Sequence, residues 1–256
     1  MDKFEITCET FTTRRHNERI VALHFQPHFL LRTANLQDRD KALAFLERVS
    51  ADQSIRALVV VGSPDAKGRQ EFMDFFRQFG TSGMDPALVH RMYNVISQLV
   101  LRLAEMNKFV VYINSGRVLA SFLNIGLACD YRILAEDALI QNPCVDVGLI
   151  AKGGGAYFIP KLIGRAKTYE IMLSKKDVSA HEARELGLVN EVVPFANLES
   201  AAFERAEEFS QKPLSSVAAL KALLNFSYQD LQRYLEHENE VLLRSFSLGN
   251  IFGKAG

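Results

Sequence analysis

The sequence predicts an α/β fold built on a parallel sheet and followed by a helical C-terminal region. Two short runs, 55–61 (IRALVVV) and 109–113 (FVVYI), are almost continuously apolar, which is typical of strands buried on both faces. Between them, apolar residues recur at helical spacing from Pro86 to Met106. A strand, a helix and a strand in this order predict a crossover that lays parallel strands side by side under helices.

The elements before this unit are predicted from similar patterns. Phe4–Cys8 and Arg19–Phe25 read as the first two strands, and Pro27 ends the second. A helix from about 36 to 49 follows. Residues 63–85 have Gly, Ser and Pro at both ends and an aromatic middle, so they are predicted to form a loop with a short amphipathic helix, a candidate lid.

From residue 157 onward nearly everything is predicted to be helical. Ser179 and Glu182 have the spacing of a capping box, and Gly187 lies just past the end of that short helix. No linker or repeat divides the chain, so we expect one structural unit, with a core at 1–195 and a C-terminal helical region at 196–256. Further helices are predicted at about 198–211, 215–226 and 229–245.

Composition limits the function classes. The chain has 30 Lys and Arg against 30 Asp and Glu, so no net charge would attract nucleic acid or an anionic membrane. No apolar stretch approaches the roughly 20 residues that span a bilayer, and the N-terminus does not read as a signal peptide, so we expect a cytoplasmic protein. The three cysteines form no CxxC pair, which predicts reduced thiols and no metal site.

The stretch 107–194 carries four spaced motifs: NKFVVYINSG, NIGLACDYRILAEDALIQNP, VGLIAKGGGAYFIPKLIG and AKTYEIMLSKKDVSAHEARELGLVNEVVP. In order and spacing they resemble the enoyl-CoA hydratase/isomerase (crotonase) superfamily. The resemblance implies a spiral of ββα turns with C-terminal helices used in assembly, as a homotrimer or a dimer of trimers. It also implies an acyl-CoA ligand, with coenzyme A as part of the substrate and no separate cofactor.

In this superfamily two backbone N–H groups hold the thioester oxygen and stabilise the charge that develops on it. One donor lies in a glycine triplet at the start of a helix, and the matching residues here are Ala120, Ser121 and Phe122, with the Ser121 N–H as donor. The other lies in a loop after the strand 55–61, where counting without gaps gives the Glu71 N–H. Substrate-binding roles are implied for Gly68, Ala120, Phe122 and Gly153.

The hydratases of this superfamily use two glutamates to orient water and move protons. The aligned positions hold Asn124 and Cys144. Asn cannot take a proton, and Cys reacts only when its pKa is lowered. Lys152 lies where some relatives place an aspartate, and it is expected either to contact a substrate carboxylate or to face solvent. Asp146 matches an acid that is usually structural, and it would point away from Cys144 in an extended segment.

Standard hydration is therefore not expected, and three functions remain open. In the first case, the chain is an enzyme that acts on an acyl-CoA thioester through the Ser121 amide and Asn124, Cys144 or Lys152. Alternatively, it is a non-catalytic protein that binds an acyl thioester or serves as a scaffold. In the third case it acts on acyl groups attached to a carrier protein.

Overall fold

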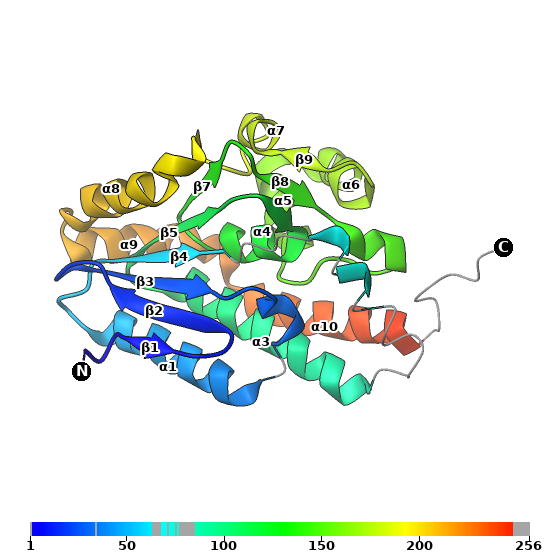
Figure 1. Ribbon diagram of the computed structural model, residues 1–256, viewed down its shortest axis with the longest axis horizontal. Coiled ribbons are helices and arrows are strands. Elements are labelled where there is room, and N and C mark those ends of the chain that lie inside the picture. Colours follow the sequence, from blue (N-terminus) through cyan, green and yellow to red (C-terminus); the bar gives the residue numbers. More distant parts are fainter. Residues whose placement is uncertain are drawn as a thin grey trace.

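The central sheet of the computed structural model has the strand order β1-β2-β3-β4-β5-β7-β10 among the described residues (Figure 1). Neighbours from β3 to β10 run parallel, whereas β1 and β2 add an antiparallel edge. The structure describes residues 2–33, 35–62, 68–70, 72–74, 76 and 85–247. The strands are β1 (Ile6–Thr7), β2 (Phe11–Arg15), β3 (Ile20–Phe25), β4 (Ala57–Val61), β5 (Phe109–Asn114), β7 (Tyr131–Ala135) and β10 (Glu191–Val193).

The two apolar runs that predicted a parallel sheet form β4 and β5, and their parallel pairing is confirmed. Val59 lies opposite Val111 in the register, and neither side chain is exposed. When both faces of a strand are covered, its side chains on either face are shielded from solvent. The alternation of apolar and polar residues is therefore missing from these runs.

The N-terminal strands differ from the prediction. The strand expected at Phe4–Cys8 shrinks to β1, and β2 was missed altogether. Phe11 and Thr13 of β2 are buried and Thr12 between them is not, as in a half-covered strand, but one of the two inward residues is a threonine. Its hydroxyl donates a hydrogen bond to the Phe4 carbonyl at 2.7 Å, so a polar residue satisfied inside the core hid the strand pattern.

Helices cover both faces of the sheet (Figure 1). On one face α8 (Leu198–Ser210) packs through Ala202 and Ala206, which have no exposed surface, against β4 and β5. The other face is covered by α1 (Leu36–Ala51) and α3 (Pro86–Glu105), and α10 (Leu231–Ser247) lies beside α3. The C-terminal region therefore shares the core with the rest of the chain.

A second, smaller sheet positions the predicted site. It has the order β6-β8-β9, with β6 (Arg117–Leu119), β8 (Leu139–Gln141) and β9 (Val178–Ser179). β5, β6 and α4 (Ala120–Leu127) form one ββα turn, and β7, β8 and α5 (Gly155–Ile163) form the next. This repetition agrees with the ββα spiral that the sequence predicts.

The C-terminal helices lie close to their predicted positions, and the mostly helical character after residue 157 is confirmed, apart from two short strands that were not predicted. β9 and β10 each have so few residues that they leave no periodic pattern, and β10 still joins the main sheet through Glu191 opposite Ile133. The capping box of Ser179 and Glu182 is confirmed. The remaining helices are α6 (Arg165–Leu173), α7 (Ala180–Glu185), α9 (Leu214–Leu224), and the 3-10 helices η1 (Phe29–Leu31), η2 (Pro143–Val147), η3 (Phe195–Asn197) and η4 (Asn225–Tyr228).

The candidate lid at 63–85 falls mostly outside the described residues. Of this segment the structure describes 68–70, 72–74, 76 and 85, and within it the rings of Phe72 and Phe76 lie 4.5 Å apart between centroids. Among the described residues, no helix combines the length and the apolar character needed to cross a membrane.

Candidate active site

The start of α4 forms one side of the candidate site. β6 runs directly into this helix, and its N-cap residue, Leu119, has no side-chain group that could accept from the first helical N–H groups. Ser121 is the second residue of the helix and is only 7% exposed. The first amides of a helix have no acceptor within it, and the helix dipole favours negative charge there. A buried, uncapped helix start of this kind suits an anionic oxygen.

Gly68 brings a second backbone segment close to this helix start. Its φ is +46°, and a Cβ added there would lie 2.3 Å from Gln141 Oε1 and 2.8 Å from Arg117 Cβ. Gln141 pairs with Leu119 in the small sheet, so Gly68 lies beside the strand that leads into α4. Only glycine fits this conformation and this space. The other predicted donor, the Glu71 N–H, lies outside the described residues.

Arg69 anchors the segment that contains Gly68. Its backbone N–H donates to Gln141 Oε1 at 2.9 Å, and its guanidinium binds Asp146 and, at 2.8 Å, Asp177. Asp146 lies in the 3-10 helix η2, so the condition of an extended segment is not met, and its carboxylate is bound to Arg69. The structural role predicted for Asp146 agrees with this contact. The role of Arg69 was missed because its partner is 77 residues away along the chain.

Asn124 holds the turn that precedes α5. The side chain is 2% exposed, and its Nδ2 donates to the carbonyls of Ala151 at 3.2 Å and Lys152 at 3.1 Å. A Cβ on Gly155 would lie 2.6 Å from Asn124 Oδ1, so the amide also packs tightly on the helix start. Both amide hydrogens are engaged, and a glutamate here would set its oxygens against two carbonyls. The geometry gives Asn124 a positioning role and offers no group for proton transfer.

Cys144 lies in η2 and is 6% exposed. Burial raises the pKa of its thiol to about 12, and the nearby Asp146 carboxylate also raises it. A thiol with such a pKa is neutral at pH 7, whereas a nucleophilic cysteine must be a thiolate. The environment therefore does not support the reacting role predicted for Cys144.

Lys152 does not face solvent, so that expectation was wrong. It is 3% exposed, and its ammonium forms an ion pair with the Glu238 carboxylate of α10. The same carboxylate accepts from the backbone N–H groups of Gly153 at 3.3 Å and Gly154 at 3.0 Å. Burial lowers the pKa of Lys152, and the charge of Glu238 opposes this shift. The Gly153 N–H is therefore already engaged by Glu238. Substrate binding by Gly153 stays a prediction.

Two glycines make this arrangement possible. Gly153 and Gly154 have φ values of +110° and +80°, a region that side chains with a Cβ rarely adopt. In this conformation both N–H groups point at one carboxylate. Burial raises the pKa of the Tyr93 phenol in α3 well above its ordinary value, and Cys144 and Glu238 add to the rise.

The remaining predicted residues separate into two groups. Ala120 lies at the start of α4 with Ser121. Phe122 has no exposed surface, and its ring packs 5.9 Å from Phe25 and 6.1 Å from Phe29 between centroids. Phe122 thus belongs to the core, and its predicted contact with substrate has no support in this packing.

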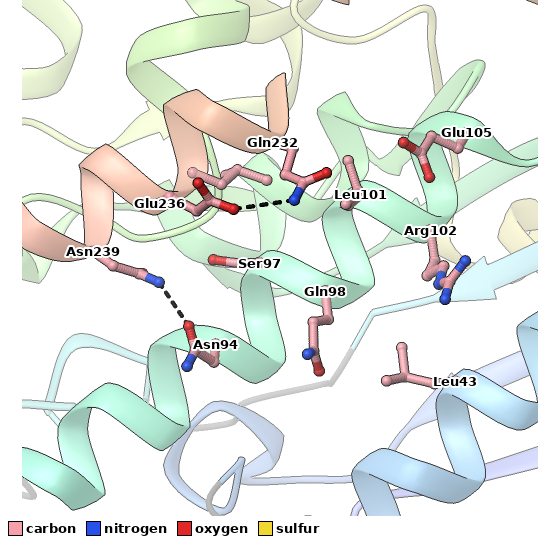
Figure 2. Close-up of a pocket in the computed structure, with 11 residues that line it drawn as sticks. Leu43, Asn94, Ser97, Gln98, Leu101, Arg102, Glu105, Gln232, Glu236 and Asn239 are labelled. Atoms are coloured by element: carbon pink, nitrogen blue, oxygen red, sulfur yellow. Dashed lines mark hydrogen bonds between the residues drawn. The ribbon is translucent and has the colours of Figure 1, made fainter. Parts of the chain in front are cut away.

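A polar pocket of about 480 Å³ lies between α1, α3 and α10 (Figure 2). Across it Asn239 donates to Asn94 at 2.8 Å, as Figure 2 shows. None of the site residues predicted from the sequence lines it. Glu238, the neighbour of Asn239 in α10, is bound instead to the turn at 152–154. The pocket is lined by Leu43, Asn94, Ser97, Gln98, Leu101, Arg102, Glu105, Gln232, Leu235, Glu236 and Asn239.

Comparison with known proteins settles the family. The family model for enoyl-CoA hydratase/isomerase matches residues 32–250. The chain belongs to the enoyl-CoA hydratase/isomerase family. The chain is 29% identical over 221 residues to the fatty acid oxidation complex subunit alpha of Shewanella amazonensis, covering 84% of this chain but only 31% of that longer protein. It is 28% identical over 199 residues to a probable enoyl-CoA hydratase of Mycobacterium tuberculosis, covering 72% of this chain and 69% of that one.

Solved structures confirm the crotonase fold. An enoyl-CoA hydratase from Bacillus halodurans superposes with a TM-score of 0.79 at 20% identity, covering 95% of this chain and 97% of the other. A putative enoyl-CoA hydratase/isomerase from Acinetobacter baumannii gives 0.76 at 21% identity, covering 94% and 95%. At 20–21% sequence identity, this similarity shows that the chain shares the fold of these structures, and nothing more.

Sequence reasoning missed Glu238, although a signal was present in this family member. The inward face of α10 carries Leu231, Leu235 and Leu242, each 2% exposed. Glu238 lies on the same stripe at helical spacing and is 8% exposed. A charged residue inside an apolar stripe is rarely buried without a partner, so the pattern calls for a buried cation elsewhere in the chain.

Proposed function

We propose that this family member binds an acyl thioester, with the thioester oxygen at the N-terminus of α4, and catalyses proton transfer next to the thioester. The observation that carries the proposal is the buried, uncapped start of α4 beside Gly68. Donors fixed in a dry site stabilise the negative charge of an enolate far better than water does. Isomerisation of a double bond needs such an enolate and one group that moves a proton.

Hydration is the reaction that the site supports least. It requires groups that orient and deprotonate water, and the two positions that resemble the family's glutamates hold Asn124 and Cys144. The first is bound to two carbonyls, and the second is a neutral thiol. The same two observations favour a second candidate function, a non-catalytic protein that binds an acyl thioester or acts as a scaffold.

The acyl group should be uncharged near Lys152. A lone buried ammonium would attract a substrate carboxylate, but Glu238 already neutralises this one. A second carboxylate would meet the charge of Glu238 in a site with little water, where like charges repel strongly. This supports a plain hydrocarbon chain over a dicarboxylic acyl group. The acyl carrier is either coenzyme A or a carrier protein.

Assembly is part of the proposal. α9 and η4 expose Leu220, Leu223, Leu224 and Phe226, with between 57% and 76% of each side chain in solvent. Apolar groups gathered on neighbouring turns are typical of a protein interface. We propose that this surface joins subunits, as a homotrimer or a dimer of trimers, in the cytoplasm. Sedimentation equilibrium of the purified chain measures the subunit number, and a monomer at micromolar concentration contradicts this part.

Calorimetric titration with octanoyl-CoA, coenzyme A and octanoate tests binding. We expect octanoyl-CoA to bind at least tenfold more tightly than either fragment. Ser121→Pro removes one N–H at a helix turn that tolerates proline, and should weaken octanoyl-CoA binding at least tenfold. Arg165→Pro, at the start of α6, is the matched control and should bind as the parent does.

Mass spectrometry with 2-enoyl-, 3-enoyl- and dienoyl-CoA thioesters separates the two functions. Conversion between 2-enoyl and 3-enoyl forms supports the isomerase, whereas binding without any conversion supports the non-catalytic protein. Octanoyl groups on coenzyme A and on an acyl carrier protein, titrated side by side, identify the preferred carrier. Failure of both to bind would contradict acyl-thioester recognition altogether.

A further inference from the structure

Glu238 is the one acidic side chain on the inward stripe of α10, in the described residues. It lies between Leu235 and Leu242, and its side chain is 7% exposed. A carboxylate in such surroundings is stable only when several donors face it. Here three do: the Lys152 ammonium and the N–H groups of Gly153 and Gly154.

These donors leave part of the carboxylate unused. Oε2 accepts from Lys152 and Gly153, and Oε1 accepts from Gly154. A carboxylate offers about four acceptor positions, two on each oxygen, so Oε1 retains one. Glu238 is thus fixed in orientation, and among the described residues Oε1 keeps one acceptor position.

The turn that holds the carboxylate lies against α4. A Cβ on Gly153, whose N–H binds Glu238, would lie 3.1 Å from Asn124 Cβ and 3.7 Å from the Ser121 carbonyl oxygen. The turn that holds Glu238 therefore packs directly on the helix whose first amides would bind the thioester oxygen.

We infer that Glu238 supplies the carboxylate for proton transfer that positions 124 and 144 lack. The inference deepens the proposed function and rests on it. Oε1 of Glu238 takes a proton from the carbon next to the thioester carbonyl. The electron pair of that C–H bond forms the enolate, whose oxygen charge is held at the start of α4. The proton then returns from Glu238 to the same carbon or, in an enoyl substrate, to the far end of the double-bond system.

Lys152 is a positioning residue in this scheme. Its buried ammonium forms an ion pair with the Glu238 carboxylate and holds that carboxylate in place. The Gly153 and Gly154 amides fix the carboxylate plane, so the proton-accepting oxygen does not have to be ordered when substrate binds.

Exchange of hydrogen for deuterium in octanoyl-CoA tests the inference. In D₂O, the protein should introduce deuterium next to the thioester carbonyl, a reaction that requires only deprotonation and return of a deuteron. Mass spectrometry follows the mass of the acyl group. Glu238→Gln should lower the exchange rate at least 100-fold while changing the Kd for octanoyl-CoA by less than threefold. Glu240→Gln, an exposed acid on the same helix, is the control and should exchange at the parent rate.

A purely structural role of Glu238 predicts a different result, in which binding and exchange fall together. If Glu238→Gln does not fold, as circular dichroism would show, Lys152→Met/Glu238→Gln removes both buried charges at once and provides a second protein for the same two measurements. Exchange that persists in the Gln variant, or in the double variant, overturns the assignment.

Failures of the two proposals are distinguishable. A parent protein that exchanges deuterium at a rate unchanged in Glu238→Gln refutes the role of Glu238 alone. A parent protein that binds octanoyl-CoA but does not exchange refutes both the role of Glu238 and the proton transfer of the proposed function, and leaves thioester binding intact. A parent protein that does not bind octanoyl-CoA refutes the proposed function and the role of Glu238 with it.

Discussion

The surroundings of Cys144 and of Glu238 differ sharply, although both side chains are buried. At Cys144 burial and the Asp146 carboxylate both raise the pKa, so the thiol is neutral. At Glu238 an ammonium and two backbone amides converge on the carboxylate. The two sites therefore differ in the number of donors fixed around the buried group, and a buried carboxylate needs such donors.

The largest effect should come from breaking the Lys152–Glu238 pair. Glu238→Leu leaves a buried ammonium without a counter-ion and should cost about 3–5 kcal/mol of the free energy of unfolding. Lys152→Met/Glu238→Leu should cost clearly less than Glu238→Leu alone, because no charge is left unpaired. Urea denaturation measures both. Equal costs for the single and double variants would show that the two charges are not coupled.

Asn124 tests whether buried acceptors also depend on fixed donors at a position without charge. Asn124→Ala leaves the Ala151 and Lys152 carbonyls without donors and should cost about 1–3 kcal/mol. Asn124→Asp should be less stable at pH 8 than at pH 5. Its carboxylate repels the two carbonyls, while the protonated form regains one donor, so the pKa is raised in the folded state and stability falls as pH rises through it. A variant equally stable at both pH values would contradict this account.

Arg69 should show a smaller effect, because its side chain is 28% exposed and water screens its ion pairs. Arg69→Met should cost about 1 kcal/mol, measured by thermal denaturation. Arg102→Met removes an ion pair between side chains that are 48% and 59% exposed, and it should have almost no effect. If both variants lose the same stability, Arg69 does not anchor its segment through Asp146 and Asp177.

The smallest effect is expected at Cys144 itself. With its pKa at about 12, the thiol should not react measurably with a disulfide reagent at pH 7.5, and the buried Cys129, whose pKa burial raises to about 12 as well, should behave alike. Peptide mapping after labelling identifies the modified residues, and labelling in urea provides the control. Fast labelling of Cys144 in the folded protein would reveal a thiolate and restore it as a candidate nucleophile.

Much of the fold could be predicted from local patterns. β4, β5, α3 and α8 follow from runs and periods that depend only on which face is buried. β2 could not be predicted, because Thr13 takes an inward position and is satisfied by a carbonyl that the sequence does not place nearby. The very short β10 has no period of its own, and its position follows from its pairing with β7.

The candidate site was predictable in part. Resemblance pointed to Ser121 and Asn124, which the structure places in one helix, and to Gly68, which lies beside the strand pair that leads into that helix. The partner of Lys152 was not predictable, because it lies 86 residues further along the chain and no short motif connects the two. Charge pairs of this kind depend on tertiary packing alone.

The order of synthesis gives the turn at 152–154 a further significance. Lys152 leaves the ribosome 86 residues before Glu238, a delay of roughly 4–17 s at about 5–20 residues per second. Until α10 docks, the ammonium has no counter-ion and the two glycine amides have no carboxylate. The nascent chain can therefore form its sheet early, but it cannot complete this site until α10 has been synthesised and has docked.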